Sequence, residues 1–198
     1  MKRLFNLIGL AGFAVGMVAC SDTMDTKEKT GVNPTLEMIA QRRSVRRYTD
    51  RKVSGDTIDM LLRAAMSAPS SKDRRPWQSV VVDDRATLDT LGARLPFASM
   101  LAHVPQALVV CGDSAISESW FLDCSAATQN FLLAAQATGL AAVWTGVYPN
   151  ADRIVTVQEV LGLPENIMPL AVVPFGYGDG MEQPKDKYDA SRIHYNKW

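Results

Sequence analysis

The segment from Ser119 to Thr138 constrains the fold more than any other part of the chain. Its sequence is typical of a helix, and Gly139 follows it, at the position where glycine commonly ends a helix. Apolar side chains, among them Trp120 and Phe131, occur around nearly its whole circumference. A helix of this kind has to be buried on more than one side. A domain of this size covers such a helix most easily by pairing with a second copy, so the sequence predicts a homodimer.

Shorter helices and strands surround this segment. Ile58, Leu61 and Ala65 repeat at intervals of three and four residues, which predicts a helix that is capped by Ser54 and buries one face. Apolar runs rich in β-branched residues indicate buried strands. The expected strands cover 78–83, 107–111, 140–144 and 170–173. The other expected helices cover 84–91 and 152–161, and Gly162 is expected to end the second of them.

Length and charge limit the partners. With 198 residues, of which 47% are apolar, the chain is long enough for one sizeable core and too short for two ordinary domains. Its 21 basic and 21 acidic side chains cancel, so no overall field would draw it to a nucleic acid. Any phosphate group that it binds must therefore be held by a local cluster of basic residues.

The first nineteen residues have the pattern of a secretory signal. Two basic residues precede an apolar stretch that ends directly before Cys20. This order resembles a bacterial lipoprotein signal, in which Cys20 would be acylated, although Met17 stands where leucine is usual. We expect a signal peptide over 1–19, a flexible tether over 20–33 and a cell-envelope protein anchored in the membrane through its lipid alone. Ordinary signal cleavage with a free Cys20 is the alternative.

The sequence lacks the motifs of thiol-dependent enzymes, metalloenzymes, serine hydrolases and dinucleotide-binding proteins. Cys111 and Cys124 lie in apolar segments and are expected to be buried side chains rather than nucleophiles or ligands. His103 and His194 are far apart, and no metal-binding spacing of Cys and His occurs, so no metal is expected. There is no Gly-x-Ser-x-Gly elbow for a hydrolase, and the glycines at 176–180 do not open a helix as a dinucleotide fingerprint would.

A basic run after a short amphipathic helix, which begins near Pro34, is the candidate binding element. Four arginines and a serine fall within six positions, namely Arg42, Arg43, Ser44, Arg46 and Arg47. A guanidinium group matches two phosphate oxygens at once, and a serine hydroxyl can approach closely. The run is typical of a phosphate clamp, and a solvated basic face is the alternative.

Three further motifs follow this run along the chain. They are an elbow from Ala68 to Trp77 (APSSKDRRPW), a strand end from Trp144 to Gly146 (WTG) and a tail segment from Pro184 to Tyr188 (PKDKY). Together with the basic run, they resemble the motifs of the nitroreductase-like family of FMN-dependent oxidoreductases. The resemblance covers 34–198, and the ordered set of motifs is specific where no single one is.

This resemblance implies an α+β fold, an α/β sandwich whose central mixed sheet is flanked by helices, assembled as an intertwined homodimer. It also implies an FMN-dependent enzyme in which NAD(P)H reduces the flavin and leaves. A nitro compound, a quinone or a similar small acceptor then takes the electrons in a ping-pong reaction. Since the flavin carries the chemistry, no catalytic side chain is expected.

Carried over position by position, the resemblance also implies which residues hold FMN. The phosphate and ribityl end would be held by Arg42, Arg43, Ser44 and Arg46, together with Lys185 and Lys187 of the tail. The elbow residues Pro69, Ser70, Ser71 and Asp73 would approach the flavin from the partner subunit, and the amides of Thr145 and Gly146 would face the N5 edge of the ring.

Asp73 and Arg75 depart from the family pattern, which usually has Asn and Gln at these two positions. An amide both donates and accepts hydrogen bonds, whereas a carboxylate only accepts them. We therefore expect Asp73 to pair with Arg74 or Arg75 and to influence the choice of acceptor rather than flavin affinity.

Two other functions are compatible with the same motifs. One is a noncatalytic flavin-binding or scavenging lipoprotein at the cell surface, because NAD(P)H is scarce outside the cytoplasm. The other is a different reaction on the same scaffold, such as reductive dehalogenation or oxidative cleavage of the flavin. Relatives of that kind carry extra lid segments, and the stretch 113–119 is too short for an obvious lid.

Overall fold

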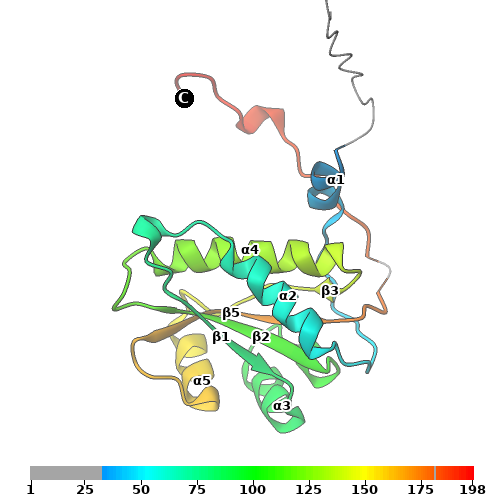
Figure 1. Ribbon diagram of the computed structural model, residues 1–198, viewed down its shortest axis with the longest axis vertical. Helices are drawn as coiled ribbons and strands as arrows, with labels where there is room; N and C mark the ends of the chain where they lie inside the picture. Colours follow the sequence, from blue (N-terminus) through cyan, green and yellow to red (C-terminus); the bar gives the residue numbers. More distant parts are fainter. Residues whose placement is uncertain (1–32, 181) are drawn as a thin grey trace, which may run out of the picture. The chain divides into compact units, whose positions relative to one another are not determined.

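The computed structural model describes residues 33–180 and 182–198, which form one sheet with helices on both faces (Figure 1). The helices are α1 (Pro34–Gln41), α2 (Gly55–Met66), α3 (Arg85–Arg94), α4 (Trp120–Ala137) and α5 (Ala151–Leu161). The strands are β1 (Trp77–Val82), β2 (Gln106–Asp113), β3 (Ala141–Ala142), β4 (Thr145–Gly146) and β5 (Ile167–Gly176). Short 3-10 turns occupy Ser71–Asp73, Ser99–Ala102 and Ala190–Arg192.

The helix ends follow from local sequence. The side chain of Ser54 caps α2 by accepting a hydrogen bond from the amide of Thr57. Helix α5 ends at Gly162, whose φ of 62° is the left-handed conformation that glycine adopts most easily. Both helices were expected from these caps. Helix α3 begins at Arg85, one residue after the predicted start at 84, and continues to Arg94, beyond the predicted end at 91.

Two helical layers enclose the sheet. Helices α2 and α4 lie above it in Figure 1, and α3 and α5 lie below it. On the upper face Phe131 of α4 packs edge-on against Phe175 of β5, with 5.3 Å between ring centroids. On the lower face Leu88 of α3 and Val157 of α5 are buried in a second core cluster. The predicted α/β sandwich is confirmed.

The sheet differs from the prediction in strand direction and in the predicted strand 140–144, which is found as the shorter strand β3, with β4 following it. The strand order is β1-β2-β5-β3, with β4 also paired to β5, and every one of these pairs is antiparallel. A mixed sheet is therefore wrong for the residues that the structure describes. Alternating helices and strands suggest crossovers between parallel neighbours. Here, however, the helical connections bring the chain back so that each new strand runs opposite to the neighbour it joins.

Strands β3 and β4 are two parts of one edge segment, 141–147, that runs along β5. Between and after them, the amide of Val143 donates to Pro174 (3.2 Å) and that of Val147 donates to Leu170 (2.9 Å). The N–H and C=O groups of one extended residue point to the same side, and the side alternates along the strand. The polar groups of the odd-numbered residues therefore face β5, and those of the even-numbered residues face the outer edge.

Candidate functional site

The basic run is attached to this outer edge. The amide of Val45 donates to the carbonyl oxygen of Ala142 at 3.2 Å, and the side chains of Val45 and Tyr48 are buried in the core. The Tyr48 hydroxyl lies 2.6 Å from the carbonyl oxygen of Val45 and 3.1 Å from that of Pro174. Burial raises the pKa of Tyr48, so the hydroxyl stays a hydrogen-bond donor. These contacts fix the backbone between the arginines.

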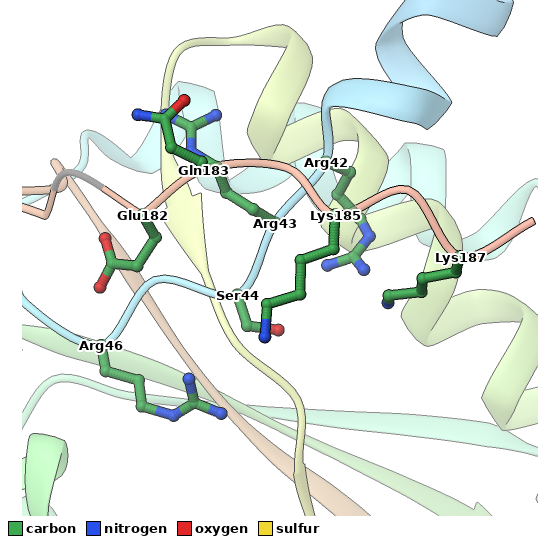
Figure 2. A pocket seen from close by; sticks show the side chains of 8 residues that line it. All are labelled: Arg42, Arg43, Ser44, Arg46, Glu182, Gln183, Lys185 and Lys187. Carbon is green, nitrogen blue, oxygen red and sulfur yellow. The ribbon is translucent and has the colours of Figure 1, made fainter.

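A cavity of about 410 Å³ brings the basic run together with the tail (Figure 2). Its lining residues are Arg42, Arg43, Ser44, Arg46, Glu182, Gln183, Lys185 and Lys187. All six residues predicted for the phosphate end are among them. Five carry positive charge, against a single carboxylate, so the cavity has the electrostatic character of an anion site.

A second cavity of about 280 Å³ lies beside the strand end. It is lined by Arg46, Pro96, Phe97, Val143, Trp144, Thr145, Gly146 and Arg153. Arg46 lines both cavities and therefore marks their junction. A site that runs along the outer edge from Ala142 to Gly146 would be about 13 Å long, at 3.3 Å per residue.

Gly146 leaves open space at this edge. A Cβ atom added there would meet no neighbouring atom nearer than the Trp144 indole nitrogen, at 3.9 Å. Because Gly146 is an even-numbered residue of the edge segment, its N–H points outward, whereas the N–H of Thr145 points to β5. The carbonyl oxygen of Gly146 accepts a hydrogen bond from Nη1 of Arg153 at 3.1 Å. Of the two predicted amides, the geometry favours that of Gly146 for a ligand.

Sequence reasoning did not single out Arg153 or Phe97. Arg153 lies in the first turn of α5, where an isolated arginine gives no motif. Phe97 has a positive φ of 63° and is 84% exposed, which is unusual for a phenylalanine. The position of Arg153 beside the cavity and the exposure of Phe97 cannot be predicted from the order of residues in the sequence.

The elbow is a strained turn that lies apart from both cavities. Lys72, Asp73 and Arg75 have φ values of 53°, 52° and 49°, a conformation that costs non-glycine residues about 1 to 3 kcal/mol each. Such backbone persists only where surrounding contacts fix it. Neither cavity includes any residue from 69 to 75, so within one chain the elbow does not reach the basic site.

Asp123 of α4 supplies these contacts. The residue is 6% exposed, and its carboxylate accepts hydrogen bonds from the hydroxyl of Ser70 (3.2 Å) and the amide of Ser71 (3.0 Å). The Ser70 oxygen in turn accepts from the amide of Arg75 at 2.7 Å. Asp123 was also missed by sequence reasoning, because its partners lie more than 50 positions away.

We expect Asp123→Ala to lower the free energy of unfolding by about 1 to 3 kcal/mol, because the polar groups of Ser70 and Ser71 lose their buried acceptor. Hydrogen exchange of the amides from 70 to 75 should accelerate. Urea unfolding and exchange followed by mass spectrometry measure the two effects. The exposed Asp59 on α2 provides the control, and Asp59→Ala should change the unfolding free energy by less than about 0.5 kcal/mol. Unchanged exchange in the elbow would show that other contacts hold it.

The predicted pairing of Asp73 is confirmed. Its two carboxylate oxygens accept from Nε and Nη2 of Arg75 at 2.7 and 2.5 Å. The hydrogen bond from Arg75 holds the pKa of Asp73 below its usual value. Both side chains of the pair are exposed to solvent, so the ion pair neutralises the two charges but contributes little to the stability of the fold.

Both cysteines are buried, as predicted. Burial raises the pKa of Cys111 and Cys124 to about 12, which keeps both thiols protonated and unreactive at neutral pH. Among the described residues, no group of three or more His, Cys, Asp or Glu side chains could hold a metal ion.

Known proteins resemble this chain along most of their length. A protein of Methanothermobacter thermautotrophicus, provisionally named NADH dehydrogenase/NAD(P)H nitroreductase, is 41% identical over 89% of this chain and 94% of its own. A crystal structure of a protein with the same provisional name, from Parabacteroides distasonis, is 56% identical, with a TM-score of 0.83 over 84% of this chain and 100% of the other. A provisionally named nitroreductase from Desulfovibrio desulfuricans, solved in complex with FMN, is 28% identical, with a TM-score of 0.74 over 85% of this chain and 99% of the other.

These relatives correct the predicted location. The expectation of a lipid-anchored cell-envelope protein is wrong, because proteins matched over nearly their full length are named as dehydrogenases and nitroreductases, and none of the three as a lipoprotein. In the described part of the chain, no helix has the length and apolarity needed to cross a bilayer. The predicted signal peptide (1–19), the acylated Cys20 and the tether up to residue 32 lie outside the described residues. An apolar stretch before a cysteine is a compositional pattern that many sequences share, so it was a weak guide to location.

The family model for nitroreductases matches residues 39–115 and 93–177, which include the basic run, the elbow and the strand end. The fold agrees with that match, since the Parabacteroides distasonis structure has a TM-score of 0.83 to this chain. This chain belongs to the nitroreductase family.

Proposed function

We propose that the protein is an FMN-dependent oxidoreductase that takes electrons from NAD(P)H and passes them to a nitro compound, a quinone or a similar small acceptor. The observation that carries this proposal is the arrangement along the edge segment. The strongly basic cavity lies next to the second cavity, which contains Gly146, and Arg46 lines both of them. A molecule with a phosphate at one end and a flat ring at the other fits this arrangement.

The residues present suit the phosphate and the ribityl chain of FMN. Arg42, Ser44, Lys185 and Lys187 offer cationic and hydroxyl donors to phosphate oxygens. Nε of Arg43 and Oε2 of Glu182 are buried and have no hydrogen-bond partner among the described residues. A buried donor and a buried acceptor without partners favour a ligand that brings both kinds of group, as the ribityl hydroxyls do.

When bound, FMN would supply the redox chemistry, accepting a hydride from NAD(P)H and releasing electrons to the acceptor. The chain's own residues bind and orient it. The basic cavity would hold the phosphate, and the outward N–H of Gly146 would donate a hydrogen bond at the edge of the ring. The absence of a side chain at Gly146 would let the ring approach the backbone closely.

The elbow would complete this site from a second copy of the chain. Pro69, Ser70 and Ser71 lie apart from both cavities in one chain, so only a partner could bring them to the ring. Asp73 is already paired with Arg75, and its place in the elbow would let it influence which acceptor enters.

The proposed reaction is tested by mixing the FMN-loaded protein anaerobically with NADH or with NADPH. We expect at least one of the two nicotinamides to reduce the flavin, which is seen as a loss of flavin absorbance. A nitroaromatic compound or a quinone that is added afterwards should restore the absorbance. Flavin that dithionite reduces, but neither nicotinamide does, would contradict the proposed reaction. The noncatalytic surface lipoprotein has no support, since it depends on the location that the relatives overturn.

The proposed homodimer rests on an apolar surface between α1, α2 and α4. The groove there is lined by Pro34, Thr35, Met38, Ile39, Ala64, Ser67, Asn130, Leu133, Ala134 and Ala137. Leu36 and Ile39 of α1 are 63% and 50% exposed, and no residue of α1 is buried. In the tail Tyr195 is 84% exposed and Trp198 fully exposed, so these rings have no core of their own. A second copy could cover both surfaces, with the tail wrapping around its partner.

We expect sedimentation velocity to show a dimer at micromolar concentration, because an interface of this kind commonly buries more than about 2,000 Å². Ile39→Glu should shift the protein toward the monomer and weaken FMN binding together with dimerisation. Asp59→Glu, on an exposed part of α2, is the control and should change neither. A flavin-loaded monomer of the wild-type protein at that concentration would contradict the dimer.

A further inference from the structure

One cation beside the strand end does not line the basic cavity. Arg153 lines the second cavity, and the residue is partly buried. Its backbone is fixed at the start of α5, where the amide of Arg153 donates to the side-chain oxygen of Asn150 at 3.1 Å. An arginine side chain carries a fixed positive charge in proteins. A permanent positive charge therefore faces the cavity that the ring would occupy.

Arg153 also fixes the backbone that would meet the ring. Its Nη1 donates to the carbonyl oxygen of Gly146, and the next amide, that of Val147, donates to Leu170. The peptide between Gly146 and Val147 is thus held at both ends. Glycine would otherwise be the most mobile residue of this edge. The hydrogen bond from Arg153 therefore holds the carbonyl side of Gly146. The preceding peptide, which carries the outward N–H of Gly146, is held by the pairing of Thr145 with Val172 of β5.

The charge of a flavin ring changes during the proposed reaction. A hydride from NAD(P)H brings two electrons and one proton to neutral oxidised FMN, so the ring gains one negative charge and NAD(P)⁺ is released. A fixed cation and an aimed N–H favour the state in which that charge has developed. Both groups meet at Gly146, and neither requires a proton transfer from the protein.

We propose that Arg153 is a positioning residue that makes the site bind reduced FMN more tightly than oxidised FMN. The proposal rests on the proposed function, because it requires FMN in the second cavity. It differs from the role of the basic cavity, whose residues hold a phosphate that carries the same charge in both redox states. Arg153 should therefore change the ratio of the two affinities, whereas Arg42 should change both affinities equally.

Three substitutions separate charge from structure. Arg153→Gln keeps a hydrogen-bond donor but removes the charge, Arg153→Met removes both, and Arg153→Lys keeps the charge. The matched control is Arg47→Gln, which removes the same charge from an exposed arginine that lines neither cavity. The readouts are the affinity for oxidised FMN by fluorescence titration and the midpoint potential of bound FMN by anaerobic dye equilibration.

We expect Arg153→Gln and Arg153→Met to lower the preference for reduced FMN about tenfold, which is about 30 mV in the midpoint potential of a two-electron couple. Arg153→Lys and Arg47→Gln should stay within about threefold of the wild type. If Arg153→Gln weakens the binding of oxidised and reduced FMN equally and leaves the midpoint potential of bound FMN unchanged, Arg153 has only a structural role and the proposal is overturned. Wild-type protein that binds no FMN would instead overturn the proposed function itself.

Discussion

Arg42→Ala is expected to weaken FMN binding about ten- to a hundredfold and to leave riboflavin binding unchanged. Arg42 lines the basic cavity together with the tail lysines and does not line the second cavity. A charge-assisted contact to phosphate is worth about 1.5 to 3 kcal/mol, and riboflavin has no phosphate. Titration of both ligands, followed by flavin fluorescence, measures the difference directly.

Two other arginines give this experiment its controls. Arg47→Ala removes the same charge from an exposed side chain outside both cavities and should alter neither affinity by more than about threefold. Arg46→Ala should weaken both ligands, because Arg46 lines both cavities. Equal binding of FMN and riboflavin by the wild-type protein would show that the basic cavity is a solvated surface and holds no phosphate.

Gly146→Val should reduce the affinity for FMN and for riboflavin alike, by about ten- to a hundredfold, without loss of fold stability. A Cβ atom added at Gly146 meets no protein atom closer than the indole nitrogen of Trp144, at 3.9 Å, so we expect the ligand-free protein to accommodate the substitution. A β-branched residue also suits an extended edge strand. With a ring in the cavity, the same atoms would overlap the ligand, and overpacking of this order costs about 1 to 3 kcal/mol.

The stability of the variant separates this explanation from misfolding. Thermal unfolding of ligand-free Gly146→Val should coincide with that of the wild type within a few degrees. Gly55→Val is the control, since Gly55 also has open space around it but lies at the start of α2. Unimpaired binding of both ligands by Gly146→Val would place the ring elsewhere, and the proposed site along the edge segment would be wrong.

The sequence predicted those parts of the candidate site that depend on short stretches of neighbouring residues. Capping residues located α2 and α5, and the basic run and the tail lysines were assigned to one phosphate site, which the cavity between them now brings together. Local patterns could not show Asp123 beneath the elbow or Arg153 beside Gly146, because each depends on how distant segments pack. Strand direction was misjudged for the same reason, since it depends on where each helical connection returns to the sheet.

The outer edge of the segment 141–147 has a consequence for solubility. An unpaired strand edge is a template on which another chain can add a strand, which is a common start of aggregation. Here the amide of Val45 occupies the edge at Ala142, and the side chain of Arg153 occupies it at Gly146. These two contacts shorten the stretch of edge that is open to a foreign strand. If the proposed site lies on this edge, the contacts that shape it also limit the growth of the sheet.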